Sequence, residues 1–102
     1  MSLKGKNIIV TGASGGIGNS IVKKLSEAGS NVLATGTRLE KLEELKSKFN
    51  KIKILKFDIS ETDKIEDFLE RASNELGNPL DCLVNNAGIT KDNLAIRMSV
   101  DE

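Results

Sequence analysis

The chain of 102 residues has no histidine, tyrosine or tryptophan, and it carries one cysteine and one proline. Without histidine it has neither an imidazole metal ligand nor a histidine-based acid–base pair. The single cysteine, Cys82, permits no internal disulfide, and its place in an apolar run predicts a small buried hydrophobe. These absences remove most familiar catalytic arrangements from the chain itself.

Charge and hydrophobic runs exclude further classes of protein. Fifteen basic residues balance fifteen acidic ones, which argues against a nucleic-acid partner because such a partner requires a basic face. No apolar run approaches the roughly 20 residues that span a bilayer, so no membrane segment is expected. Residues 1–4 lack the long apolar stretch of a signal peptide, so we expect a cytoplasmic protein.

Short β-branched runs alternate with segments of helical spacing. The runs predict strands over residues 7–11, 31–35, 52–57 and 80–84. Apolar stripes, the first of which begins at Ile17, predict helices over residues 17–28, 39–49 and 65–76. The final dozen residues are expected to form a loop that enters a further helix.

Local signals mark the ends of these helices. Gly29 and Gly77 suit the left-handed residue that follows a helix, and Pro79 prevents the third helix from continuing. Ser60 and Asp63 resemble a capping box, with aspartate in place of the usual Glu or Gln, and predict the start of the third helix.

The order βαβαβαβ predicts an α/β fold, the N-terminal portion of a Rossmann-type doubly wound parallel sheet. We interpret residues 1–102 as the dinucleotide-binding part of a single such domain, truncated after strand four. Strands one, two and three lie side by side, and strand four lies beside strand one if the third helix crosses to the opposite face. The gap between strands one and four is then the switch point where ligands bind. Without a fifth strand, strand four is expected to expose an unpaired edge.

A glycine-rich turn joins the first strand to the first helix, over residues 11–18. The N–H groups at a helix N-terminus bind anions such as a pyrophosphate, and glycine lets the backbone approach the ligand. The spacing Gly12, Gly16, Gly18 differs from the general G-x-G-x-x-G, and no Gly-Lys-Ser/Thr follows to make a triphosphate loop. A tight turn without a ligand is the alternative interpretation.

This turn reads T-G-x-x-x-G-x-G, and Asn85-Asn86-Ala87-Gly88 follows the fourth strand. With both motifs the chain resembles the short-chain dehydrogenase/reductase family along essentially its whole length. The resemblance implies that a nicotinamide dinucleotide binds at the switch point. Its implied contacts are Gly12, Ser14, Gly15, Gly16, Ile17 and Gly18 at the pyrophosphate, Asp58 and Ile59 at the adenine, and Asn86, Ala87 and Gly88 at the ribose and nicotinamide.

The resemblance also indicates which dinucleotide binds. Thr37 and Arg38 stand where NADP-preferring relatives hold the 2′-phosphate, and no carboxylate that would favour NAD follows the second strand before Glu40. Many relatives carry a second arginine at the position of Gly15. We therefore expect NADP(H) as the cofactor, with a solvated Arg38 as the alternative.

Residues 85–94, followed by Arg97-Met98, resemble the corresponding segment of 3-oxoacyl-(acyl-carrier-protein) reductases. That resemblance implies an acyl carrier protein or another acyl thioester as the partner, with Lys91 and Arg97 as basic residues near the site mouth. Acetoacetyl-coenzyme A reductases share these motifs and remain an alternative, as does the view that the two charges are merely solvated.

The family's catalytic serine, tyrosine and lysine lie farther along the chain than Glu102, and this chain holds no catalytic residue of that set. We expect a homotetramer for a full-length protein. The favoured interpretation is the N-terminal part of an oxidoreductase, and the alternative is a complete small nucleotide-binding module or a remnant that pairs with another chain.

Overall fold

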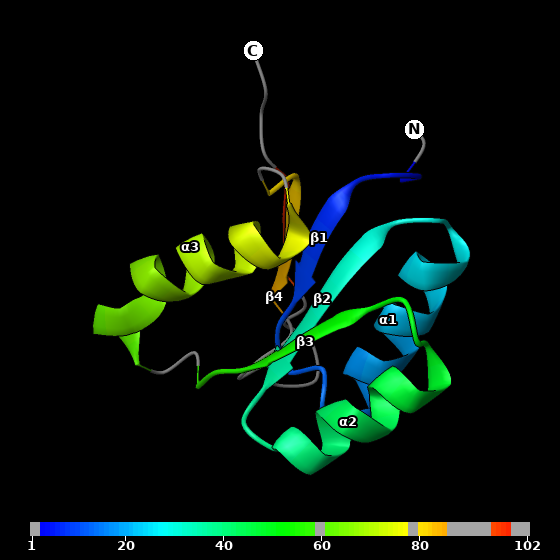
Figure 1. The fold of residues 1–102 in the computed structure, drawn as a ribbon, viewed down its shortest axis with the longest axis horizontal. Helices are drawn as coiled ribbons and strands as arrows, with labels where there is room; N and C mark the ends of the chain where they lie inside the picture. Colours follow the sequence, from blue (N-terminus) through cyan, green and yellow to red (C-terminus); the bar gives the residue numbers. More distant parts are fainter. Residues whose placement is uncertain (1–2, 59–60, 78–79, 86–94, 99–102) are drawn as a thin grey trace.

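A single sheet with helices on both faces makes up the structure, a computed structural model that describes residues 3–58, 61–77, 80–85 and 95–98 (Figure 1). Its strands are β1 (Asn7–Val10), β2 (Asn31–Gly36), β3 (Lys53–Lys56), β4 (Cys82–Asn85) and β5 (Ala95–Met98). The helices are α1 (Gly16–Glu27), α2 (Leu39–Lys48), α3 (Ile65–Leu76) and the short 3₁₀ turn η1 (Thr62–Lys64). The described helices include none long and apolar enough to cross a membrane.

The central strand is β1, because the strand order is β3-β2-β1-β4-β5. It runs parallel to both neighbours, with Val10 opposite Ala34 on β2 and opposite Val84 on β4. Helices α1 and α2 cover one face of the sheet and α3 covers the other (Figure 1). This arrangement confirms the Rossmann-type sheet, and it places the connections after β1 and β4 at the same carboxyl edge.

Strand β1 is buried on both faces, which explains the apolar run from Ile8 to Val10. Ile8 and Val10 pack with Val22, Leu42 and Leu45 under α1 and α2. On the opposite face, the core cluster consists of Ile9, Leu33, Phe68 and Ala72. Successive side chains of β1 therefore pack into two separate cores, one on each face of the sheet.

Helix ends agree with the glycine signals but not with the predicted capping box. Gly77 follows α3 at φ 81° and Gly29 follows α1 at φ 86°, both left-handed as predicted. Helix α3 begins at Ile65, after η1, and its N-cap residue Lys64 makes no side-chain cap. The capping-box prediction for α3 is therefore wrong, since Asp63 lies within η1. Ser60, the other residue of that box, lies outside the described residues, as does Pro79, which was predicted to end the helix.

Strand β5 occupies part of the segment that was expected to be a loop entering a further helix, and residues 91–94 and 99–102 of that segment lie outside the described residues. Residues 95–98 pair antiparallel with β4, with Cys82 opposite Met98 and Asn85 opposite Ala95. The expected unpaired edge on β4 is wrong for the same reason. An open strand leaves a row of N–H and C=O groups without partners, and pairing with β5 satisfies them, whereas one or two helical turns would not.

The other edge of the sheet is β3, which pairs with β2 in the described part of the chain. This strand is four residues long, and its first and last residues, Lys53 and Lys56, are exposed. Short edge strands with exposed lysines resist pairing with other chains.

Cys82, on β4, is buried as predicted. Burial raises the pKa of its thiol, and the negative charge of Asp81 raises it further.

We expect Leu42→Ala to lower the free energy of unfolding by about 2–5 kcal/mol, because it removes a fully buried side chain from the core under α2. Leu39→Ala, on the same helix, is the control: Leu39 is 42% exposed, and its truncation costs less than about 0.5 kcal/mol. Urea unfolding followed by circular dichroism measures both. Equal losses for the two variants would contradict the assignment of the core.

Candidate functional site

The glycine turn lies at the carboxyl end of the central strand, where it is fixed to both neighbouring strands. The backbone N–H of Thr11 donates to the carbonyl oxygen of Val84 over 3.0 Å. The N–H of Ala13, which is fully buried, donates to the carbonyl oxygen of Thr35 over 2.9 Å. The turn is thus held across β4, β1 and β2, at the switch point that the sequence predicts.

Two glycines of the turn are required by the fold itself. Gly12 has φ 63°, a left-handed conformation that side chains disfavour. A Cβ on Gly18 would lie 2.5 Å from the carbonyl oxygen of Gly12 and 2.6 Å from the Cα of Ala13. Helix α1 therefore starts against the turn at a distance that admits no side chain.

The fold itself does not require glycine at positions 15 and 16. Neither has a positive φ, a Cβ on Gly16 would meet nothing within 4 Å, and one on Gly15 would meet one atom at 3.9 Å. Both residues are exposed. Because glycine carries an entropic cost that the fold does not demand here, an approaching ligand is the physical reason we assign to Gly16, whereas Gly15 stands where many relatives carry arginine.

The first turn of α1 presents a favourable surface to an anion. Its N-cap residue, Gly15, makes no side-chain cap, and the first turn contains no acidic residue. The helix dipole and the uncapped N–H groups therefore attract negative charge. Ile17, predicted as the start of the apolar stripe, is instead 58% exposed; its place in the first turn, ahead of the buried Gly18 and Val22, leaves it outside the core.

The end of β2 lies directly against the glycine turn. A Cβ on Gly36 would lie 3.0 Å from the Oγ of Ser14, so the absence of a side chain brings the two segments together. Thr37 and Arg38 follow and are exposed, and Arg38 is the N-cap residue of α2 without a side-chain cap. An arginine beside an uncapped helix start is a suitable environment for a phosphate.

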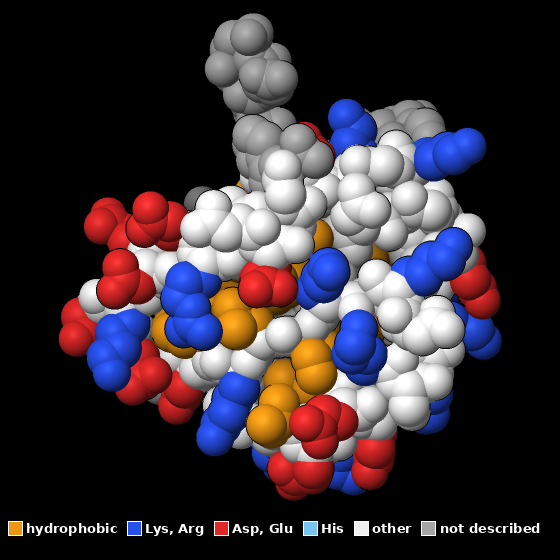
Figure 2. All heavy atoms as spheres, viewed as in Figure 1, with side chains coloured by type: hydrophobic (Ala, Val, Ile, Leu, Met, Phe, Trp, Pro, Cys, Tyr) orange, Lys and Arg blue, Asp and Glu red, His pale blue; other side chains and the backbone are white. Residues whose placement is uncertain are grey.

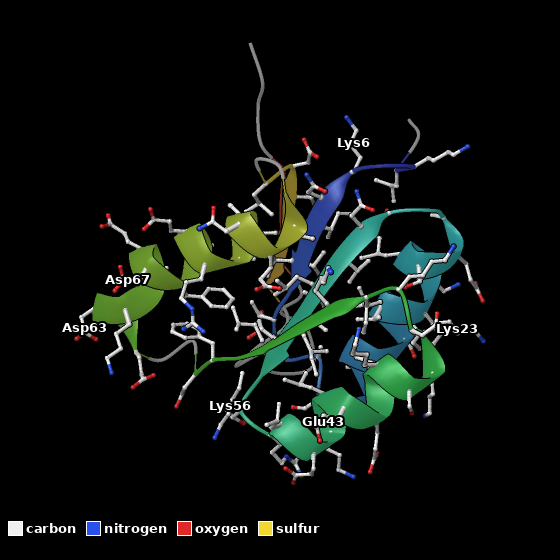
Figure 3. The ribbon with its side chains drawn as sticks, viewed as in Figure 1. Lys6, Lys23, Glu43, Lys56, Asp63 and Asp67 are labelled. Atoms are coloured by element: carbon white, nitrogen blue, oxygen red, sulfur yellow. The ribbon has the colours of Figure 1, made fainter. Side chains whose placement is uncertain are left out.

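A groove of about 560 Å³ continues from Thr37 past the end of β3 to α3. Asp58, predicted at the adenine, lines it, and the ring of Phe57 stacks on Phe68 with centroids 4.3 Å apart. Lys56 lines the same groove and extends from the end of β3 near the connection into α2 (Figure 3). Charged side chains of both signs surround hydrophobic ones on this face (Figure 2).

The structure brings most of the predicted site residues to one edge of the sheet. Gly12, Ser14, Gly15, Gly16, Ile17 and Gly18 form the turn, with Thr37, Arg38 and Asp58 at the ends of the next two strands. Predicted residues Ile59, Asn86, Ala87, Gly88 and Lys91 lie outside the described residues, as does the side chain of Arg97. No role was predicted from the sequence for Lys56 or Asn19. The sequence offered only weak signals for them: Lys56 is a lysine at the end of a strand, and Asn19 is a polar residue one turn into a helix.

The chain is similar in sequence to proteins of one known family. The sequence model of the family described as short chain dehydrogenase matches residues 6–102. Nodulation protein G of Rhizobium sp. is 44% identical over 98 residues, which is 95% of this chain and 40% of that protein. The 3-oxoacyl-(acyl-carrier-protein) reductase FabG of Pseudomonas aeruginosa is 44% identical over 106 aligned residues, covering 100% of this chain and 42% of the relative.

Solved structures show the same fold. A short chain dehydrogenase from Mycobacterium smegmatis superposes with a TM-score of 0.79 at 28% identity, over 86% of this chain and 38% of that one. A short-chain dehydrogenase/reductase from Serratia marcescens gives 0.78 at 34% identity, over 87% of this chain and 38% of that one. The chain thus spans well under half the length of the relatives that it matches.

We expect Gly18→Ala to lower the free energy of unfolding by about 3 kcal/mol, because its new Cβ collides with backbone atoms that have no room to move. Gly16→Ala is the matched control, since it enters open space at a helical position where alanine gains up to about 1 kcal/mol. Urea unfolding measures both. A Gly18→Ala variant as stable as the unmodified chain would contradict the close approach of α1.

Proposed function

Since the chain belongs to the short-chain dehydrogenase/reductase family, we propose that it forms the dinucleotide-binding part of an enzyme that reduces 3-oxoacyl-(acyl-carrier-protein) to the 3-hydroxyacyl product with NADPH. The observation that carries the proposal is the glycine turn, in which Gly15 and Gly16 leave open space at an uncapped helix start. Such a surface suits the pyrophosphate of a dinucleotide.

The described residues fit the pyrophosphate and adenosine portions of this cofactor. The first turn of α1 would hold the pyrophosphate, Thr37 and Asp58 would hold the adenosine, and the exposed Ile17 would offer an apolar contact beside the turn. When bound, the nicotinamide ring supplies the hydride for reduction of a carbonyl. The described residues do not carry out the reduction; they bind and orient the cofactor, so that its reactive ring is held at the switch point.

NADPH is proposed over NADH because of the groups at the end of β2. No acidic residue lies at Thr37 or Arg38 to accept hydrogen bonds from a ribose 2′-hydroxyl, and Arg38 is free to pair with a phosphate through its planar guanidinium. Lys56 lines the groove that begins at Thr37 and adds positive charge there. These cations replace the arginine that many relatives carry at the position of Gly15.

The substrate class rests on the relatives. Several proteins named as 3-oxoacyl-(acyl-carrier-protein) reductase are 39 to 44% identical to this chain. The proposed partner is accordingly an acyl carrier protein or another acyl thioester, with Lys91 and Arg97 raising the rate of encounter with an acidic carrier. A homotetramer is the proposed state of the full-length enzyme. Acetoacetyl-coenzyme A is the alternative substrate.

A second candidate function is nucleotide binding without catalysis. It needs only the glycine turn and the groove beyond Thr37, which the described residues already form. Both candidates share the cofactor site and differ in whether residues elsewhere complete the reaction.

We expect calorimetry on the folded chain to show tighter binding of NADPH than of NADH. Arg38→Ala should weaken NADPH binding by about tenfold to a hundredfold, the range expected for a lost charge-assisted pair, and leave NADH binding unchanged. Lys48→Ala, at the far end of α2, is the control and should change neither. Equal affinity of the unmodified chain for the two cofactors would rule out the proposed preference.

We expect the purified 102-residue chain to show no NADPH-dependent reduction of an acetoacetyl thioester, because it lacks the family's catalytic tyrosine. Loss of NADPH absorbance is the measurement, with a full-length family member as the positive control. Turnover by the 102-residue chain above the rate without protein would show that another group donates the proton.

A further inference from the structure

Asn19 lies one turn into α1, behind the glycine turn, and its side-chain amide contacts that turn twice. The Nδ2 atom donates to the carbonyl oxygen of Ala13 over 3.1 Å and to that of Gly15 over 3.0 Å. The backbone N–H of Asn19 also donates to the Gly15 oxygen over 3.0 Å. One amide group thus binds two carbonyls from opposite ends of a three-residue segment.

These contacts determine where two backbone N–H groups point. In a trans peptide the C=O and N–H bonds are directed oppositely, and the described residues include no cis peptide bond. The carbonyls of Ala13 and Gly15 face Asn19, so the N–H groups of Ser14 and Gly16, which share those peptide planes, face away from it. Neither of these N–H groups donates a hydrogen bond within the described part of the chain.

The segment is also fixed on the side that faces β2, so it is held from two directions. The N–H of Ala13 is bound to the Thr35 carbonyl of β2, and Ala13 is fully buried. The segment between Ala13 and Gly16 contains two glycines at exposed positions, and glycine is the residue with the most conformational freedom to lose. Without Asn19, nothing on the α1 side binds the Ala13 carbonyl among the contacts described.

We infer that Asn19 is a positioning residue for the cofactor: it holds the carbonyls of Ala13 and Gly15 inward so that the N–H groups of Ser14 and Gly16 face the pyrophosphate. This inference rests on the proposed dinucleotide site. Asn19 does not touch the ligand. It acts by orienting the turn before the ligand arrives, which reduces the ordering cost of binding.

The test compares Asn19→Ala with Ser20→Ala, an exposed neighbour on the same helix, using NADPH and adenosine 2′-monophosphate as calorimetric probes. The 2′-monophosphate has the adenosine and 2′-phosphate but no pyrophosphate. We expect Asn19→Ala to weaken NADPH binding by about tenfold, in keeping with the loss of ordinary hydrogen bonds, and to leave binding of the monophosphate unchanged. Ser20→Ala should change neither. Unchanged NADPH binding in Asn19→Ala, or equal losses for both probes, would overturn the inference.

A second measurement separates this inference from the proposed function. In the free protein, amide NMR should show changed shifts and faster hydrogen exchange at Ser14 and Gly16 in Asn19→Ala but not in Ser20→Ala. If the unmodified chain binds no dinucleotide, the proposed function fails. The orienting role then stands or falls on these amides, and unchanged amides would overturn it.

Asn19→Asp provides the variant for the case in which Asn19→Ala does not fold. It keeps the shape of the side chain, and a carboxylate is favourable in the first turn of a helix, but it has no N–H group to donate. The same changes at the Ser14 and Gly16 amides are expected. A folded Asn19→Asp variant with native amide shifts at these residues would contradict the inference.

Discussion

The close approach of α1 to the end of β1 is the constraint on which the site depends. The backbone of Gly18 lies so near the Gly12 carbonyl and the Ala13 Cα that even a methyl group has no space. This contact brings the N-terminus of α1 to the carboxyl end of the central strand, instead of leaving it displaced by the width of a side chain. The positive end of the helix dipole and the switch point of the sheet therefore coincide.

The glycines of the turn divide into two groups with different physical causes. Gly12 is needed for the chain to turn, and Gly18 is needed for the helix to pack. Gly15 and Gly16 are not needed by the backbone or by packing, and they leave the outer surface of the turn open. The side chain of Asn19 completes the arrangement from behind, where it binds the carbonyls of Ala13 and Gly15.

Much of this fold was predictable from the sequence because parallel strands buried on both faces appear as short apolar runs. The run from Asn7 to Val10 and the glycines after α1 and α3 fall into that class of local signal. Strand β5 has no such local signal. Residues 95–98 form a strand by pairing with β4, and local spacing in the sequence does not encode that contact. The apolar stripe predicted the bounds of α3, residues 65–76, but the capping box did not: the chain enters α3 through η1, so Asp63 lies in that turn and the N-cap residue of α3 is Lys64.

The candidate site divides in the same way. The spacing of the glycines and the lack of an acidic residue after β2 were visible in the sequence and predicted the turn and the cofactor preference. The exposure of Ile17 and the contacts of Asn19 required the folded turn, because each depends on where α1 begins relative to the sheet.

Amide NMR during titration of the unmodified chain with NADPH tests the central claim most directly, because it reports which backbone N–H groups meet the ligand. We expect the largest shifts at Ser14, Gly16 and Ile17, with further shifts at Thr37 and Arg38. Shifts confined to the hollow lined by Ser26, Ser30 and Phe49, where β2 and β3 begin, or no shifts at the glycine turn of a folded protein, would contradict it.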